Sequence, residues 1–249
     1  MQKPRTLFFG ILFIILGITT QSMAAKMVDH SLFAGLLDKY IASGKVNYSG
    51  LKKAEATLDT YLAILAKVDS KSLPRDEQFA FYANAYNAWT IKLILGGYPG
   101  VESIKDLGNL FKSPWKKEIA SIDGKLMTLD HIEHNILRPR FMDPRVHFAI
   151  NCAAKSCPPL SDKPFTGETL DQQLEQLASA FVNDSANNYL KGNTLYVSSI
   201  FKWFKSDFKA GILDFFLKYS KDDLNARLKM IKKNVKIKYL DYDWSLNGK

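Results

Sequence analysis

Both cysteines of this 249-residue chain lie in one stretch, RVHFAINCAAKSCPPL, at positions 152 and 157, shortly after His147. Cysteines this close together have three possible uses: a disulfide, a reactive thiol beside a base, or small buried side chains. A disulfide requires a loop here, because helical residues five apart hold their Cα atoms too far apart. Closing so short a loop would stabilise the fold by roughly 2 kcal/mol. The residues alone leave all three uses open.

The run VHFAINC alternates between apolar and other residues, which predicts a β-strand over 146–152. On a strand, His147 and Cys152 point to opposite faces, so a direct pair between them requires a turn at Asn151. Cys157 lies beyond such a turn and could reach either residue. The strand therefore favours Cys157 as the partner of the histidine.

A second group of ionisable residues lies in TLDHIEHNILRP. Thr128 is placed to cap a short helix that ends before Arg138. His131 and His134 share a face of that helix, whereas Glu133 lies to one side. In zinc enzymes that use two histidines and a glutamate from one helix, the histidines are four residues apart and the glutamate stands at a different position from the one here. No metal site is therefore predicted.

A helix that begins near Ser72 and ends at Gly96 is predicted to be central, because it is apolar or aromatic almost all round between 79 and 95. Ser72 is the expected N-cap. Asn84 and Asn87 lie three apart on one face of it. Buried amides need hydrogen-bond partners, which could be loop backbone, a reacting histidine or a ligand.

The rest of the chain mixes both element types. A hairpin with a turn at Asp123-Gly124, a strand over 193–199 and a closing strand over 234–244 are predicted together with a helix over 170–182. No repeat or long linker divides the chain. We expect one α+β domain, with several helices packed around a small, largely antiparallel sheet.

The first 25 residues have the three parts of a signal peptide: a basic start, an apolar run over 7–18 and small residues before the cleavage point. A helix needs about 20 apolar residues to cross a bilayer. The run over 7–18 has only twelve, so no membrane anchor is predicted. We expect an exported protein whose mature domain is 26–249, in the periplasm or secreted.

The formal net charge of +9 falls to about +7 when Lys3 and Arg5 are removed with the signal peptide. A basic excess suits an anionic envelope component or another envelope protein, although it also serves solubility alone. Nucleic acid is not an expected partner of an exported protein, and no cofactor is predicted.

Five segments in order resemble one family, the domain of unknown function numbered 547: FYANAYNAWTI, IEHNILRP, DPRVHFAINCAAKSCPPL, SSIFKWFKSDF and YLDYDWSLN. Ala83 departs from the family's usual larger apolar residue. The resemblance implies motif residues at the following positions: Asn84, Tyr86, Asn87, Glu133, His134, Arg138, Arg145, His147, Cys152, Cys157, Trp203 and Asp207.

This set supports two functions. In the first, the protein is a binding or scaffolding module of the envelope with a disulfide across the 152–157 loop. In the second, it is a thiol-dependent hydrolase or acyl transferase that acts on peptide or amide bonds. One cysteine would then attack, His147 or His134 would be the base, and Asn87 or Glu133 would orient that base. Tyr86, Arg138, Arg145, Trp203 and Asp207 are the expected binding residues, with Asn84. A catalytic thiol is exposed to oxidation in that compartment, which favours the first function.

Overall fold

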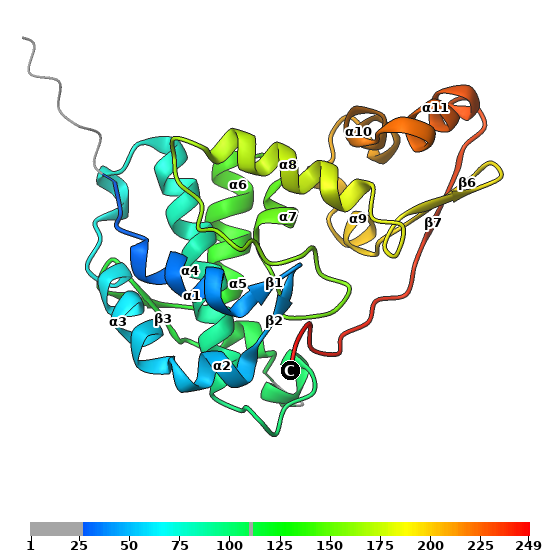
Figure 1. The fold of residues 1–249 in the computed structure, drawn as a ribbon. Coiled ribbons are helices and arrows are strands. Elements are labelled where there is room, and N and C mark those ends of the chain that lie inside the picture. The colour runs from blue at the N-terminus through cyan, green and yellow to red at the C-terminus, as the bar shows by residue number, and fades with distance from the viewer. Residues whose placement is uncertain (1–26, 110–111) are drawn as a thin grey trace, which may run out of the picture.

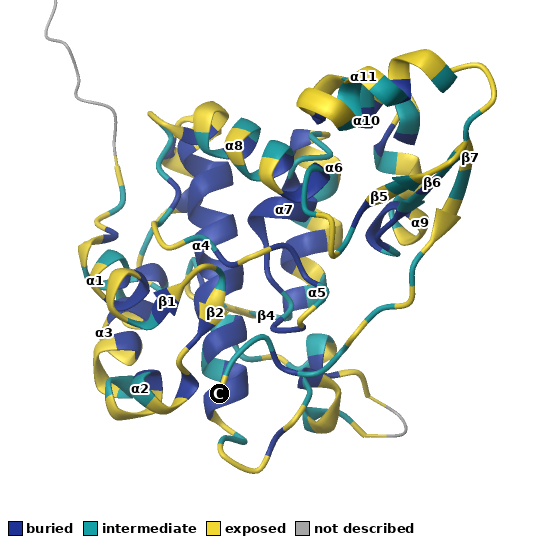
Figure 2. Ribbon diagram, turned by 45° about the vertical axis from the view of Figure 1, so that its right-hand side comes forward, coloured by how far each residue is buried: buried dark blue, intermediate teal, exposed yellow. Residues whose placement is uncertain are grey.

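Helix α4 (Arg75–Leu95) runs through the centre of the larger part of the molecule (Figures 1 and 2). Its residues from Glu77 to Ala88 are all buried, as expected of a helix without a polar face. The computed structural model describes residues 27–109 and 112–249, so the predicted signal peptide lies outside the described residues. The helix starts after Pro74, and Ser72 lies in a preceding 3-10 turn rather than at the N-cap.

The α-helices are α1 Ser31–Tyr40, α2 Tyr48–Lys53, α3 Glu55–Leu65, α4 Arg75–Leu95, α5 Leu129–His131, α6 Arg138–Phe141, α7 Val146–Ala149, α8 Leu170–Val182, α9 Ile200–Trp203, α10 Ile212–Tyr219 and α11 Asp222–Ile231. A π-helical segment, Ile132–Leu137, joins α5 to α6. Turns of 3-10 helix span Ser70–Ser72, Ile104–Leu107, Pro114–Lys116 and Lys205–Asp207. In the described residues no helix is both long and apolar enough to cross a lipid bilayer.

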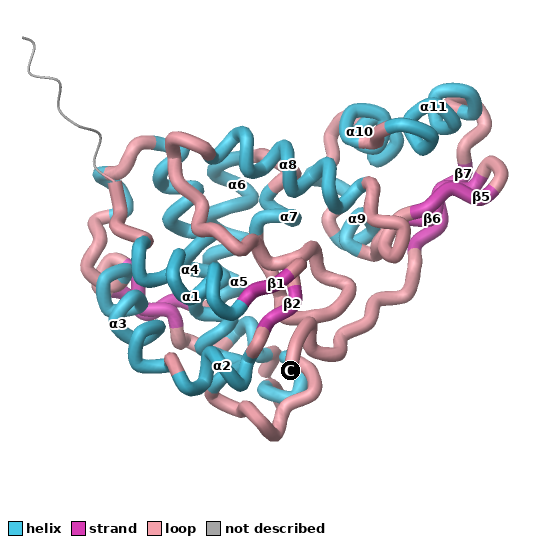
Figure 3. The backbone as a smooth tube through the Cα atoms, in the orientation of Figure 1, coloured by secondary structure: helices cyan, strands magenta, loops and turns pink. Residues whose placement is uncertain are grey.

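The strands are short and lie in three separate places in the molecule (Figure 3). They are β1 Ile41–Ala42, β2 Lys45–Val46, β3 Ala120–Ile122, β4 Lys125–Met127, β5 Tyr189–Lys191, β6 Thr194–Val197 and β7 Lys236–Tyr239. They form three small sheets instead of the single expected sheet, and every pair is antiparallel except β6–β7. The α+β class and the mainly antiparallel pairing are confirmed.

Two clusters of buried side chains form the core. The larger surrounds α4 and contains the buried faces of α1, α2 and α3. The smaller lies beneath α9, α10 and α11 and takes in one face of α8. Helix α7 joins the two, because Val146 and Ala149 belong to the first cluster and Phe148 to the second.

After β7 the chain crosses back to the larger part as an extended segment, residues 240–249, which we call the C-terminal strap (red in Figure 1). It pairs with three distant segments, through Ser245 with Ser103, Leu246 with Ala154 and Gly248 with Val46. The closing strand predicted over 234–244 is therefore only partly present, as β7. The remainder serves to connect the two core clusters.

Candidate functional site

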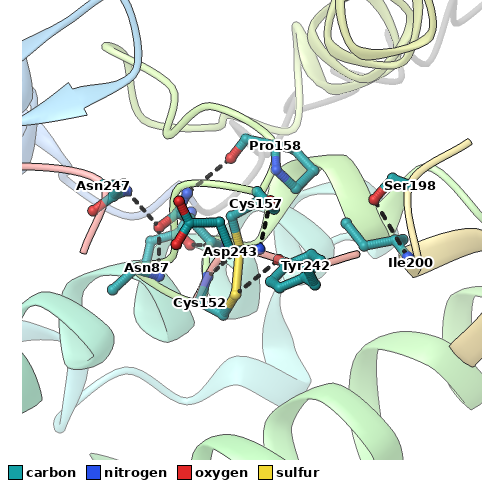
Figure 4. Close-up of a disulfide and its surroundings, with 12 residues drawn as sticks. Asn87, Cys152, Cys157, Pro158, Ser198, Ile200, Tyr242, Asp243 and Asn247 are labelled. Carbon is teal, nitrogen blue, oxygen red and sulfur yellow. Dashed lines mark hydrogen bonds between the residues drawn. A yellow bond between two sulfur atoms is a disulfide. The ribbon is translucent and has the colours of Figure 1, made fainter. Parts of the chain in front are cut away.

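The Cys152–Cys157 pair is a disulfide, and the loop that it closes is held from several sides (Figure 4). The strap accepts hydrogen bonds from this loop: Lys155 N donates to Ser245 O at 2.8 Å and Ser156 N to Asp243 O at 3.2 Å. The Tyr242 hydroxyl lies 3.3 Å from Cys152 Sγ. The loop and the strap therefore form one structural unit.

The strand predicted before this loop is wrong, because residues Val146–Ala149 form the helical turn α7. Asp143 explains the difference: its Oδ1 accepts a hydrogen bond from Arg145 N at 2.9 Å, and Pro144 follows it with a φ suited to a helix start. A short alternating run does not by itself distinguish strand from helix. The consequence is that His147 is not held on the face opposite to the cysteines.

A cavity of about 220 Å³ lies beside the disulfide, at the junction of the two core clusters. Its walls come from α4, the α5–α6 region, α7, the disulfide loop, α9 and the strap. The lining residues are Tyr86, Ser113, Trp115, Asp130, Glu133, His134, His147, Ile150, Cys152, Cys157, Pro158, Ile200, Trp203, Phe204, Tyr242 and Trp244. The structure thus brings seven of the predicted site residues to one cavity: Tyr86, Glu133, His134, His147, Cys152, Cys157 and Trp203.

His147 is held beneath the cavity wall by a carboxylate. Its Nε2 lies 2.7 Å from Asp207 Oδ2, and its ring stacks on Phe204 with 4.0 Å between centroids. A carboxylate only accepts hydrogen bonds, so Nε2 carries a proton and Nδ1 is the nitrogen left free to accept one in the neutral imidazole. Burial lowers the pKa of His147, which keeps the imidazole neutral near pH 7.

Asp207 is also paired with Arg138, at 2.6 Å from Nε and 3.0 Å from Nη2. The hydrogen bond from His147, and then the one from Arg138, hold the pKa of Asp207 well below its usual range. Arg138 Nη1 further donates to His134 Nδ1 at 2.9 Å. Arg138 and Asp207 do not line the cavity themselves, but they orient two histidines that do.

The helix predicted to end before Arg138 instead continues to Phe141, through a π-helical segment. Pro139 has no N–H to donate, and a wider turn lies directly before it, with Arg138 N bonded to Glu133 O. Glu133 was expected to lie to one side of the histidines. Instead, Glu133 and His134 both line the cavity, although they are consecutive residues.

Glu133 is buried, with 8% of its surface exposed, and burial raises its pKa to about 7. Within 27–109 and 112–249 its one hydrogen bond is a long one from the Tyr86 hydroxyl, 3.4 Å from Oε2. A carboxyl group that is partly protonated near pH 7 and faces a cavity can accept, donate or exchange a proton there. Desolvation lowers the pKa of the neighbouring His134, which is half-exposed.

Besides Arg138 and Asp207, three of the predicted site residues do not line the cavity. Asn84 and Asn87 bind loop backbone: Asn84 accepts from Phe165 N at 2.9 Å, and Asn87 accepts from Asn151 N at 2.8 Å. Each also donates to a backbone carbonyl, and Asn84 Nδ2 lies 3.2 Å from His30 Nε2. Arg145 forms ion pairs at the surface with Asp143, Asp171 and Glu175.

Several cavity residues are absent from the sequence-based prediction. Chief among them are three aromatic residues, Trp115, Tyr242 and Trp244, with Asp130. With Trp203 the three form a continuous aromatic wall, in which neighbouring ring centroids lie 4.6–5.7 Å apart. Tyr242 and Trp244 lie in the segment YLDYDWSLN near the C-terminus. Two large aromatic residues in so short a run were the sequence signal that could have identified them as binding residues.

Metal ligation is not suggested by this arrangement. In 27–109 and 112–249 no group of three or more His, Cys, Asp or Glu side chains is placed to hold a metal ion. The groups that the cavity presents are instead neutral imidazoles, one carboxyl group of raised pKa and an aromatic surface.

The chain is therefore an α+β protein with a small cavity of aromatic and ionisable residues beside a disulfide loop. Residues 70–182 of the chain match the family model described as "Protein of unknown function, DUF547", so this part is a DUF547 domain. The match contains α4, the π-helical segment, α7 and both cysteines, whereas Trp203, Asp207 and the strap lie beyond it. No curated protein and no solved structure matches the chain.

Proposed function

We propose that this protein is an exported binding module of the cell envelope, whose ligand is a small molecule or a small part of an envelope component. The observation that carries this proposal is the small cavity beside the disulfide, which combines an aromatic wall with a few convergent polar groups. Neither sulfur is a free thiol in this state of the protein, which favours binding over thiol chemistry.

Intrinsic fluorescence can test this directly, because three of the four tryptophans line the cavity: Trp115, Trp203 and Trp244. The purified protein would be titrated with a panel of envelope-derived sugars, short peptides and headgroup alcohols. We expect at least one class to change the emission with saturation. Trp203→Ala should weaken that binding at least tenfold, since Trp203 is 46% exposed and its loss is tolerable for folding.

The matched control is Tyr189→Ala, which removes an exposed aromatic ring of β5 outside the cavity. Equal affinity in Trp203→Ala and Tyr189→Ala would show that the bound compounds do not enter the cavity. That result, or the absence of any binding across the panel, would overturn the proposal.

A thiol-dependent hydrolase or acyl transferase is the second candidate, and the His147–Asp207 pair beside both cysteines favours it. In a reduced protein, one cysteine would pass its proton to His147 and attack an acyl carbon. The amine would leave with that proton, and water or a second acceptor would cleave the thioester. The test compares acyl-substrate turnover before and after reduction. Turnover that requires reduction and is lost in both Cys152→Ser and Cys157→Ser would replace the binding proposal.

The basic exterior is a separate part of the proposal. We propose that it meets an anionic envelope component, on the strength of the formal net charge, which is +9 for the full chain and about +7 without Lys3 and Arg5. A groove on the other side of the disulfide loop has Lys39, Lys45, Lys155 and Lys249 among its lining residues. Co-sedimentation with anionic vesicles at 50 and 500 mM salt tests this: binding that does not weaken with salt would contradict it.

A further inference from the structure

The charge inside the cavity is opposite to the charge of the protein. The chain carries 34 Lys and Arg against 25 Asp and Glu. Among the described residues, those that line the cavity include Asp130 and Glu133 but no Lys or Arg. Burial lowers the pKa of both lining histidines, His134 and His147, so neither supplies a full positive charge near pH 7.

Within the described residues, Glu133 has only weak contacts to its carboxyl group. Its Oε2 accepts the single 3.4 Å bond from Tyr86, and its Oε1 comes no closer than 3.9 Å to His134 Nδ1. The nearest guanidinium, that of Arg138, is committed to Asp207 and His134. Because Glu133 lines the cavity, its carboxyl group is open to a ligand that supplies a positive charge.

The aromatic wall offers a second attraction for the same kind of ligand. The face of an indole or phenol ring is negative and attracts cations, Trp most strongly. One ring of the wall already does so within the protein, because Lys105 Nζ lies 3.9 Å from the Trp244 centroid. Trp203 and Tyr242, whose centroids are 4.8 Å apart, extend this surface beside the cavity.

We propose that the cavity binds an alkylammonium group, with the aromatic wall against its methyl groups and Glu133 as its counter-ion. This rests on the proposed binding function and names the ligand class for that same site. A volume of about 220 Å³ accommodates a trimethylammonium headgroup but not a large organic molecule. Both contacts are needed: the wall alone would accept neutral apolar groups, and the carboxylate alone would accept any cation.

Choline and its uncharged isostere 3,3-dimethylbutan-1-ol form the decisive pair, because they have the same shape and differ in charge. We expect choline to quench tryptophan emission with at least tenfold higher affinity than the isostere at pH 8. In Glu133→Gln the two should bind within about twofold of each other. The control Glu168→Gln removes an exposed carboxylate outside the cavity and should keep the preference.

Binding should also depend on pH. The ionisable groups around Glu133 are Tyr86, Asp130, His134, Arg138, Asp207 and Tyr242. Burial lowers the pKa of His134 and of His147, which also lines the cavity, and raises the pKa of Tyr86 and Tyr242. Since Glu133 ionises near pH 7, choline affinity should rise about fivefold or more from pH 6 to pH 8, and Glu133→Gln should abolish that rise.

The outcomes separate the two proposals. If the isostere binds as tightly as choline, the cavity is a binding site for neutral ligands, and the alkylammonium inference alone is wrong. If neither compound binds and the wider panel is also negative, both proposals fall. Phosphatidylcholine vesicles distinguish the source of the group: co-sedimentation would indicate a lipid headgroup, whereas binding of free choline without vesicle binding would indicate a soluble compound.

Discussion

The Nε2 atom of His147 lies 2.7 Å from Oδ2 of Asp207, across the junction between the two core clusters. His147 comes from α7 and Asp207 from the 3-10 turn after α9, 60 residues later in the chain. Arg138 binds the same carboxylate from α6. A single carboxylate therefore connects three elements and also fixes which imidazole nitrogen carries the proton.

Replacement of Asp207 tests this connection. Asp207→Asn should lower the free energy of unfolding by about 1–3 kcal/mol. The reason is that Arg138 and the fully buried His147 would lose the charged carboxylate to which both donate hydrogen bonds. Urea unfolding at pH 7 measures the loss. Asp223→Asn is the control, since its exposed carboxylate pairs only with Arg227 one helical turn away, and a change below about 0.5 kcal/mol is expected there. Equal losses in the two variants would contradict the connecting role.

The carboxyl group of Glu133 predicts a distinct dependence of stability on pH. Burial raises its pKa from 4.5 to about 7, so the folded protein holds this proton between those values while the unfolded chain releases it. Its contribution to stability is complete below pH 4.5, declines as pH rises to 7 and is lost above. Relative to the natural protein, Glu133→Gln should therefore gain about 3 kcal/mol between pH 4.5 and pH 8. A difference between the two proteins that stays constant with pH would refute the raised pKa.

The disulfide should contribute modestly to stability and strongly to local order. The double variant Cys152→Ser/Cys157→Ser should lose about 2 kcal/mol, the loop-entropy value for a six-residue ring. Unfolding with and without reductant measures it, and reductant should have no effect on the variant. Free-thiol counting in denaturant should give none per chain before reduction and two after. Two free thiols in the untreated protein would show that the disulfide is absent and would support the thiol-dependent enzyme instead.

Attachment of the strap depends on a glycine near the C-terminus. A Cβ atom at Gly248 would overlap the carbonyl oxygen of Val46, so Gly248→Ala must move the strap away from β2. We expect a lower melting temperature and faster amide exchange in residues 46–49 and 245–249. Gly35→Ala is the matched control, because nothing lies within 4 Å of its added methyl group, and alanine is the better helix residue by roughly 0.5–1 kcal/mol. Unchanged exchange in Gly248→Ala would show that the strap does not need this contact.

Elements with a strong local signal could be predicted from the sequence. The absence of a polar face predicted the central position of α4, Asp123-Gly124 predicted the β3–β4 turn, and the apolar spacing predicted α8 with the bounds Leu170–Val182. Local signals failed where two of them competed. The alternation of VHFAI favours a strand, but the preceding Asp143-Pro144 starts a helical turn, and the turn is what forms.

The sequence by itself determined the fold class, the central helix and the loop that carries both cysteines, because each depends on residues within a few positions of one another. Only the tertiary structure decided which side chains share the cavity. Tyr86, Glu133, His147 and Trp244 come from four segments, and no periodicity links them. Their meeting requires the strap to return across the molecule and Asp207 to hold α7, and such long-range contacts depend on packing and chain closure instead of local propensity.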